Sequence, residues 1–296
     1  METKKRISFG NYAYCLGIKT IYNHIHPNEG IKLVDWGYLC FAGKFRKKEN
    51  MRNLLFILTF FCILTAFADN KVARIKDADG FTNIRSGQGK DFPIVARIDT
   101  TDFIYCDPTT KNDWVKVIAM KWQNGKQIEG FIHKTRIQFI EKLDNKEQKK
   151  ILTEIFIKQK NLAEDFQKTR KIKDNKETIN KLELYTDIKY SPILEILPKY
   201  FCTTSDTTII ELIFATMWAD KGSANEIPSF TIGECFVCKP DLIIRELTKL
   251  TKIEERKFII NDIEWGLLNY FEVGEDGKSN NPEFKKLKLK LDKQKP

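Results

Sequence analysis

The feature that most constrains this chain is an apolar run at residues 54–68, which follows a short basic start at residues 51–53. The run contains 15 residues. As a helix it would span roughly 22 Å, which is short of the ~30 Å hydrocarbon core of a bilayer. Ala66 and Ala68 place small residues at the two positions that a signal peptidase reads. The pattern predicts a cleaved secretory leader over residues 51–68.

Residues 1–50 precede this leader and mix aromatic, glycine and charged residues without a sustained helical or strand period. Because Met51 is a natural start, we interpret them as an upstream extension or an unstructured tail. The alternative is an uncleaved inner-membrane anchor, with Arg46, Lys47 and Lys48 on its cytoplasmic side. Both interpretations export everything that follows to the periplasm or cell envelope. Cleavage would leave no stable membrane anchor.

The charge balance argues against a nucleic-acid partner. The chain carries a formal charge of +10, but residues 1–68 hold ten Lys and Arg against four Asp and Glu. The remainder therefore carries only +4, and its tail at residues 285–295 has six Lys against one Asp. Phosphate recognition needs basic residues gathered on one face of a folded domain. We expect no nucleic acid among the partners.

Residues 71–140 are divided into short segments by turn sequences such as Asp-Gly, Asp-Pro and Asn-Gly. The segments with strand-like alternation are 72–75, 81–85, 94–98, 103–105, 114–118 and 130–133. Strands this short and frequent, with no helical period between them, indicate a small β-barrel or sandwich. Gly87 is expected in a turn, where glycine tolerates positive φ, and Gly130 at a strand start where another backbone passes close.

Four blocks in this region stand in a recognisable order: residues 79–87 (DGFTNIRSG), 92–95 (FPIV), 113–117 (DWVKV) and 130–137 (GFIHKTRI). Together they resemble the bacterial SH3 (SH3b) domain family, over about 70 of the 296 residues. The resemblance implies a small SH3-like barrel, commonly exported and often used to hold cell-wall peptides or partner proteins. It implies binding and not catalysis.

A ligand-binding face on this barrel could use Tyr105, Trp122 and Phe131, with Asp113 as a polar neighbour. Aromatic side chains suit sugar or peptide recognition because they offer a large contact area at a low cost in conformational entropy. Trp122 lies in a predicted hairpin tip, where an exposed Trp indicates a binding role. The competing interpretation places Trp114 and Phe131 in the barrel core.

After residue 140 the pattern becomes helical. Residues 142–171 carry an apolar stripe among Lys, Glu and Gln and predict a long amphipathic helix. Residues 207–220 are apolar on most faces and predict a buried central helix, and Ser191 is expected to cap another helix ahead of Pro192. The predicted fold class is α+β multidomain, with a small SH3-like β-barrel at residues 71–140 and an all-α helical domain at residues 145–296.

The cysteines that follow the leader are Cys106, Cys202, Cys235 and Cys238. We interpret the C-x-x-C pair as part of a structural disulfide that joins Cys202 to Cys235 or Cys238. Such a bridge contributes about 3–4 kcal/mol in the chain-entropy model. A redox motif is less favoured because Glu234 precedes the pair and Pro240 follows it. A zinc site would lack a second cluster of ligands, so we predict no metal and no cofactor.

The catalytic sets known for wall hydrolases are incomplete here. His133 is the one histidine after the leader and lies within an SH3b-like block, so a Cys or Ser nucleophile lacks its own base. A carboxylate-based cell-wall glycosidase stays open through Glu195, Glu211 and Glu264. The sequence predicts an exported, non-catalytic binding or adaptor protein that recognises a cell-wall peptide or an exported protein partner. The alternatives are that glycosidase and an immunity-type inhibitor of another exported protein.

Overall fold

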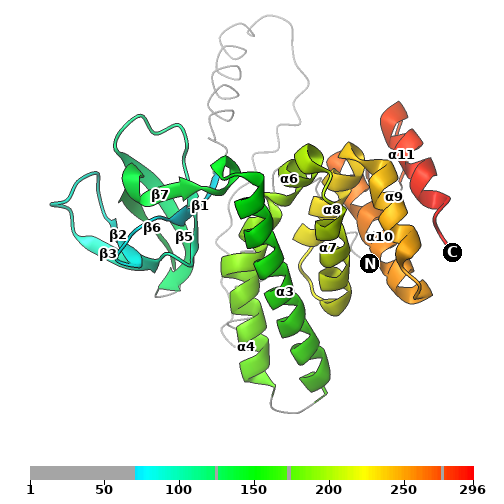
Figure 1. Cartoon of the computed structure of the whole chain (residues 1–296), viewed down its shortest axis with the longest axis horizontal. Helices are drawn as coiled ribbons and strands as arrows, with labels where there is room; N and C mark the ends of the chain where they lie inside the picture. Colours follow the sequence, from blue (N-terminus) through cyan, green and yellow to red (C-terminus); the bar gives the residue numbers. More distant parts are fainter. Residues whose placement is uncertain (1–70, 124–125, 172–174, 275–276) are drawn as a thin grey trace, which may run out of the picture. The chain divides into compact units, whose positions relative to one another are not determined.

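The computed structural model describes residues 71–123, 126–171, 175–274 and 277–296. In them an antiparallel sheet is followed by a helical region, which is the α+β layout that the sequence predicts (Figure 1). The predicted leader and its cleavage residues, as well as the N-terminal extension, lie outside the described residues: 1–50, 51–68, Ala66 and Ala68. No helix in the described ranges combines the length and apolar character needed to cross a membrane.

Seven strands of the described chain form one sheet in the order β3-β2-β6-β5-β4-β1-β7. They are β1 (Lys71–Ile75), β2 (Phe81–Arg85), β3 (Ile94–Asp99), β4 (Phe103–Cys106), β5 (Trp114–Gln123), β6 (Lys126–His133) and β7 (Ile137–Phe139). The prediction of many short strands is confirmed. Closure into a barrel is not observed, because the order begins at β3 and ends at β7 and each of these strands pairs on one side.

One face of the sheet is filled by apolar side chains from successive strands. On β5, Val115, Val117 and Ala119 are buried while Lys116 between them is exposed, as expected for alternating strand residues. The buried members of this cluster are Ala73, Ile75, Ile84, Ile98, Ile104, Cys106, Val115, Val117, Ala119 and Ile132. We call this side of the sheet the inner face and the opposite side the outer face.

Two glycines of the sheet are required by close packing. A Cβ on Gly130 would lie 2.4 Å from the carbonyl oxygen of Arg85, so the predicted close backbone approach is confirmed, within β6 and not at its start. Gly87 lies in the bend that follows β2, where the sequence predicts a turn, but the glycine of this region that adopts a positive φ is Gly80, at 78°. A Cβ on Gly87 would instead lie 2.3 Å from the ring of Phe92, which covers the turn.

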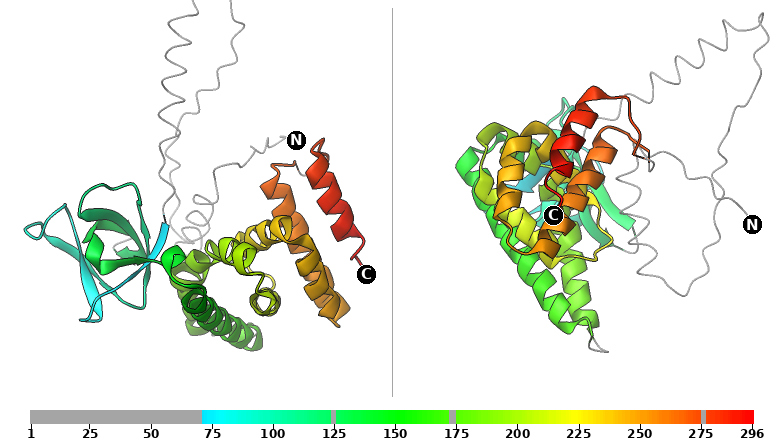
Figure 2. Two further views of the ribbon diagram at one scale, coloured as in Figure 1. Left: turned by 45° about the horizontal axis from the view of Figure 1, so that its top comes forward. Right: turned by 90° about the vertical axis from the view of Figure 1, so that its right-hand side faces the viewer.

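The helical region begins directly after the sheet. Its elements are α3 (Asn145–Thr169), α4 (Lys176–Tyr185), the π-helix η3 (Thr186–Tyr190), α5 (Ser191–Leu194), α6 (Leu197–Thr204), α7 (Thr207–Ala219), α8 (Ile227–Cys238), α9 (Pro240–Lys249), α10 (Ile253–Tyr270) and α11 (Pro282–Asp292). The helices α3 and α4 lie side by side as a hairpin, α7 packs along α3, and α10 lies between α8 and α11 (Figures 1 and 2). The short 3₁₀ turns η1 (Lys134–Arg136) and η2 (Ile140–Lys142) flank β7.

The helix boundaries follow local signals in most places. The Asp144 carboxylate accepts a hydrogen bond from the backbone N–H of Glu147, and Asp206 does the same for Thr208, so each caps its helix. The predicted buried helix is confirmed as α7. The prediction for Ser191 is wrong: its φ of −58° and ψ of −46° are helical, because the chain runs without a break from η3 into α5.

The helices α8 and α10 cross at unusually short range. A Cβ on Gly266 of α10 would lie 2.1 Å from the carbonyl oxygen of Ser229 and 2.8 Å from the Cα of Gly233, both on α8. Side chains larger than a hydrogen atom at either glycine would therefore push the two backbones apart. This crossing sets the position of α10 relative to the start of α8.

The sheet packs against the helices within one compact unit. Val72, Phe103 and Tyr105 belong to the same buried cluster as the cores of α3 and α7. The Tyr105 hydroxyl donates to the Glu195 carboxylate at 2.7 Å, and the ammonium of Lys189 lies 2.7 Å from the Asp102 carboxylate. Because the Lys189 and Asp102 side chains are 15% and 7% exposed, this ion pair is largely withdrawn from water.

Candidate binding surface on the sheet

Tyr105, predicted to contribute to a binding face, is a core residue. It lies on β4, is 6% exposed, and directs its hydroxyl to Glu195 of the helical region. Its register partner on β5 is Ile118, which packs against the same buried cluster. This end of the outer face is therefore covered by helices and is not available to a ligand.

Phe131 lies on the outer face but outside the hydrophobic cluster that joins the sheet to the helices. It is half-buried on β6, where its register partners are Lys116 on β5 and Arg85 on β2. Residues opposite one another in adjacent strands point to the same side of a sheet. Phe131, Lys116 and Arg85 therefore share the outer face.

Trp114 shares the outer face with Phe131, because it lies two residues before Lys116 on β5. Trp114 pairs with His133 across β5 and β6, and the two rings meet edge to face with centroids 5.5 Å apart. Both Trp114 and Phe131 are half-buried, and neither belongs to a hydrophobic core cluster of the described residues, so their assignment to the core is wrong. Strand alternation could have predicted the outward position of Trp114, because Trp114 lies two residues from the exposed Lys116 and residues two apart share a face.

Asp113 stands at the rim of this surface and is exposed. Its carboxylate lies 2.6 Å from the ammonium of Lys134, and the resulting hydrogen bond holds the pKa of Asp113 below its usual value. The backbone carbonyl of Asp113 also accepts from the Lys134 N–H at 2.7 Å. Asp113 thus joins the start of β5 to the end of β6, next to Trp114 and His133.

Trp122, also predicted for the binding face, lies near the end of the β5–β6 hairpin. Its backbone pairs with that of Gln127, after a register shift that follows Ala119. This position agrees with the predicted hairpin tip. The Trp122 side chain belongs to the part of the chain outside the description, so its role stays a prediction.

We define the outer-face patch as Arg85, Trp114, Lys116, Phe131 and His133. Two of its cations are held in place: Arg85 donates to the carbonyl of Phe92 at 2.8 Å, and Lys116 lies 3.3 Å from the Glu129 carboxylate. The His133 Nδ1 lies 2.8 Å from the Thr135 hydroxyl. The patch combines aromatic surface with guanidinium and ammonium groups, which suits a ligand that carries both an apolar part and a carboxylate.

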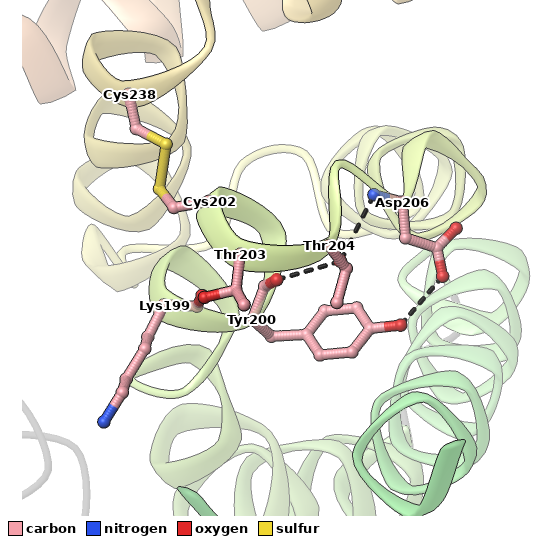
Figure 3. The surroundings of a disulfide bond; sticks show 7 residues. All are labelled: Lys199, Tyr200, Cys202, Thr203, Thr204, Asp206 and Cys238. Atoms are coloured by element: carbon pink, nitrogen blue, oxygen red, sulfur yellow. Dashed lines mark hydrogen bonds between the residues drawn. A yellow bond between two sulfur atoms is a disulfide. The ribbon is translucent and has the colours of Figure 1, made fainter. Parts of the chain in front are cut away.

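The disulfide joins Cys202 on α6 to Cys238 at the end of α8 (Figure 3). The structure thereby selects one of the two pairings that the sequence left open, and Cys235 is a free buried thiol. Burial raises the pKa of Cys235 well above its usual value and that of Cys106 to about 12. Neither thiol is poised to react, because the thiolate is the nucleophilic form.

The disulfide lies next to the short turn between α6 and α7. In that turn the Tyr200 hydroxyl donates to the Asp206 carboxylate at 2.9 Å, and Thr204 accepts from the Asp206 N–H at 3.3 Å (Figure 3). Ser205 adopts a left-handed conformation with φ of 57°, which reverses the chain between α6 and α7. The contacts around Cys202 are structural.

The carboxylates considered for a glycosidase are engaged in ion pairs or hydrogen bonds. Glu195 accepts from Tyr105, and Glu211 lies 2.5 Å from the ammonium of Lys249, which lowers the pKa of Glu211. Burial would raise the pKa of Glu264, but hydrogen bonds with two lysines bring it below its usual value. A general acid needs the opposite shift. Within the described ranges, no group of three or more His, Cys, Asp or Glu side chains could hold a metal ion.

Comparison with known proteins finds no family model, no curated protein and no solved structure that matches this chain. The resemblance to bacterial SH3 domains consequently rests on the four sequence blocks. A proposal about function therefore starts from the surface chemistry of the chain itself.

Proposed function

We propose that this chain is an exported, non-catalytic binding protein whose SH3-like sheet recognises a cell-wall peptide through the outer-face patch. The observation that carries the proposal is the position of Trp114 and Phe131 on the solvent side of β5 and β6. The inner face already has its own apolar core, so these rings are not needed to fill it. Large aromatic side chains kept half-exposed beside cations are typical of recognition surfaces.

The patch favours a peptide with free carboxylates. Arg85 and Lys116 flank Phe131 and offer charge-assisted hydrogen bonds, while the Trp114 and Phe131 rings offer flat apolar contact. The surface is small, and its cations are partly engaged by Phe92 and Glu129. A short, acidic segment of a wall peptide matches this combination better than a neutral glycan does.

Two further observations support the SH3-like and exported parts of the proposal. The close approach of β2 and β6 at Gly130 is what a tightly curled small sheet requires, although closure itself is not observed. The Cys202–Cys238 bridge is of a kind that persists in oxidising compartments, in keeping with the leader pattern.

The proposal is tested by co-sedimentation of the purified chain, in its oxidised form, with isolated peptidoglycan. We expect Trp114→Ala and Phe131→Ala to weaken binding at least tenfold each, with unchanged far-UV circular dichroism. The matched control is Leu184→Ala, which removes a side chain that is 61% exposed on α4. Equal binding by all four proteins would reject the outer-face patch as the binding site.

The ligand class is tested separately with glycan strands stripped of their peptides. We expect these strands to bind much more weakly than intact peptidoglycan, because they lack the carboxylates that Arg85 and Lys116 would bind. Equal binding would contradict the peptide assignment. Capture of an envelope protein by crosslinking, without any wall binding, would favour an adaptor role instead, and release of muropeptides by the purified chain would contradict the non-catalytic part.

A further inference from the structure

A second polar group lies inside the helical region, away from the sheet. At its centre is Gln159 of α3, which is fully buried. Its amide nitrogen donates to the Thr186 hydroxyl at 2.8 Å and to the Asp220 carboxylate at 3.4 Å. The amide oxygen of Gln159 has no hydrogen-bond partner in the described part of the chain. One helix side chain thus links η3 to the end of α7 and leaves a strong acceptor unsatisfied.

Tyr190 contributes a second unsatisfied group from the last position of η3. Its ring packs edge to face on Phe156 with centroids 5.8 Å apart, and the side chain is fully buried. The Tyr190 hydroxyl also lacks a hydrogen-bond partner among the described residues. Burial raises the pKa of Tyr190, and the nearby charges of Asp220 and Asp262 raise it further. Tyr190 lies on the same π-helical turn as Thr186, the residue that Gln159 contacts, and its ring packs on Phe156, three residues before Gln159 on α3.

Asp220 and Asp262 bring negative charge without a counter-ion. Both are half-buried, and across the described ranges neither forms an ion pair; Asp220 accepts from Gln159, and Asp262 is hydrogen-bonded to Ser229. Burial raises the pKa of each to about 6, so both are still mainly ionised at neutral pH. Partly buried carboxylates are costly unless they are paired with a cation.

We propose that Gln159, Thr186, Tyr190, Asp220 and Asp262 form a binding site for a small primary ammonium compound. An ammonium group carries one positive charge and three N–H donors. The site offers oxygen acceptors to match them: two carboxylates, the free amide oxygen of Gln159 and the free hydroxyl of Tyr190. Binding would satisfy both orphaned atoms and supply the missing counter-charge.

An ammonium fits this group better than a metal ion does. The described residues contain no set of three or more His, Cys, Asp or Glu side chains placed to hold a metal. Calcium takes six to eight oxygen ligands, whereas an ammonium is satisfied by about three acceptors. The π-helix η3 supplies both Thr186 and Tyr190, and π-helical turns are frequent at functional sites.

The test measures thermal unfolding of the full, oxidised chain at pH 7.5 with methylammonium chloride or tetramethylammonium chloride at equal ionic strength. The two cations carry the same charge, but tetramethylammonium has no N–H donor. We expect methylammonium to raise Tm in a saturable way and tetramethylammonium to leave it unchanged. Equal shifts with both salts, or a shift with calcium chloride only, would overturn the proposal.

Variants locate the site. We expect Asp220→Asn, Asp262→Asn and Tyr190→Phe each to weaken methylammonium binding at least tenfold, measured as the concentration that gives half the maximal Tm shift. The matched control is Asp187→Asn, which changes a half-buried carboxylate of η3 whose pKa is raised by burial and by the charge of Glu183. All variants preserve side-chain shape, and a cooperative transition without ligand shows that each folds. Wild-type affinity in Asp220→Asn would end the proposal.

Discussion

The outer-face patch and the polar group around Gln159 are built in opposite ways. The patch uses residues close together on two paired strands, so strand alternation alone sends Trp114 and Phe131 to the same face. The proposed polar group takes residues from α3, η3 and α10 together with Asp220, which directly follows α7. The first depends on local pairing, whereas the second depends on how the helices pack. Disturbing helix packing should therefore damage the polar group and spare the patch.

Loss of the disulfide should have the largest effect. Cys202 and Cys238 are 36 residues apart, and closing such a loop contributes about 4 kcal/mol in the chain-entropy model. We expect the double variant Cys202→Ser/Cys238→Ser to lose that much unfolding free energy in urea titrations. Reductant should destabilise the wild type and have no effect on the double variant. A wild type that is insensitive to reductant would contradict a structural role for the bridge.

The α8–α10 crossing should be the next most sensitive point. Gly266→Ala would place a methyl group 2.1 Å from the Ser229 carbonyl, so the helices must separate, at a cost of about 3 kcal/mol. The same change should weaken methylammonium binding, because Asp262 and Ser229 lie on these two helices. The control is Gly89→Ala, whose nearest neighbour is a Phe92 ring atom at 3.3 Å. Similar stability of the two variants would argue against the close crossing.

The contact between sheet and helices should respond more weakly. Tyr105→Phe removes the hydroxyl that donates to Glu195, and a hydrogen bond to a charged group contributes about 1.5–3 kcal/mol. We expect a loss of about 2 kcal/mol in chemical denaturation. Tyr270→Phe is the control, because Tyr270 is 51% exposed and should tolerate the change within about 0.5 kcal/mol. Equal effects of the two substitutions would show that the Tyr105 hydroxyl contributes nothing special.

The smallest effect should be a gain in stability. The pKa of Asp220 is raised to about 6 by burial, from an ordinary value of 3.8, so the folded state holds this proton more tightly than the unfolded state. The contribution of the protonated Asp220 to the free energy of unfolding is fully present below pH 3.8 and is lost as the pH rises toward 6. We expect Asp220→Asn to add about 1–2 kcal/mol at pH 7.5, a figure reduced for partial exposure, and to add little at pH 4.

The pH dependence provides the check on this last prediction. Denaturant titrations of wild type and Asp220→Asn at pH 4, 6 and 7.5 should diverge between the first two values and stay parallel above. Asp241→Asn serves as the control, because its side chain is 81% exposed. A gain of equal size at every pH would show that the benefit comes from packing and not from charge.

Several features of the fold could be predicted because their causes are local. The alternation on β5, the cap at Asp144 and the apolar surface of α7 are each visible in a few consecutive residues. The open edges of the sheet could not be predicted, because closure depends on whether β3 and β7 find partners. The continuous helix through Ser191 was missed because Ser-Pro also begins helices after a break.

The residues predicted for binding divide in the same way. Asp113 and Phe131 were predicted from the sequence for a binding face; in the structure Asp113 is exposed and Phe131 is half-buried on the outer face. Tyr105 looks equally suitable in the sequence, but the helical region covers it. Sequence reasoning also missed Gln159, Tyr190, Asp220 and Asp262, because nothing in their separate neighbourhoods shows that they meet.

By itself the sequence determined the order of strands before helices, the alternation that separates the two faces of the sheet, and the choice of cysteines for a bridge. The tertiary structure alone decided that the helices cover Tyr105, that Cys238 and not Cys235 pairs with Cys202, and that the buried amide of Gln159 meets Thr186 and Asp220. The physical reason is the distance along the sequence over which each interaction acts. Backbone propensity and strand period act over a few residues, whereas burial and charge compensation depend on which distant segments come together.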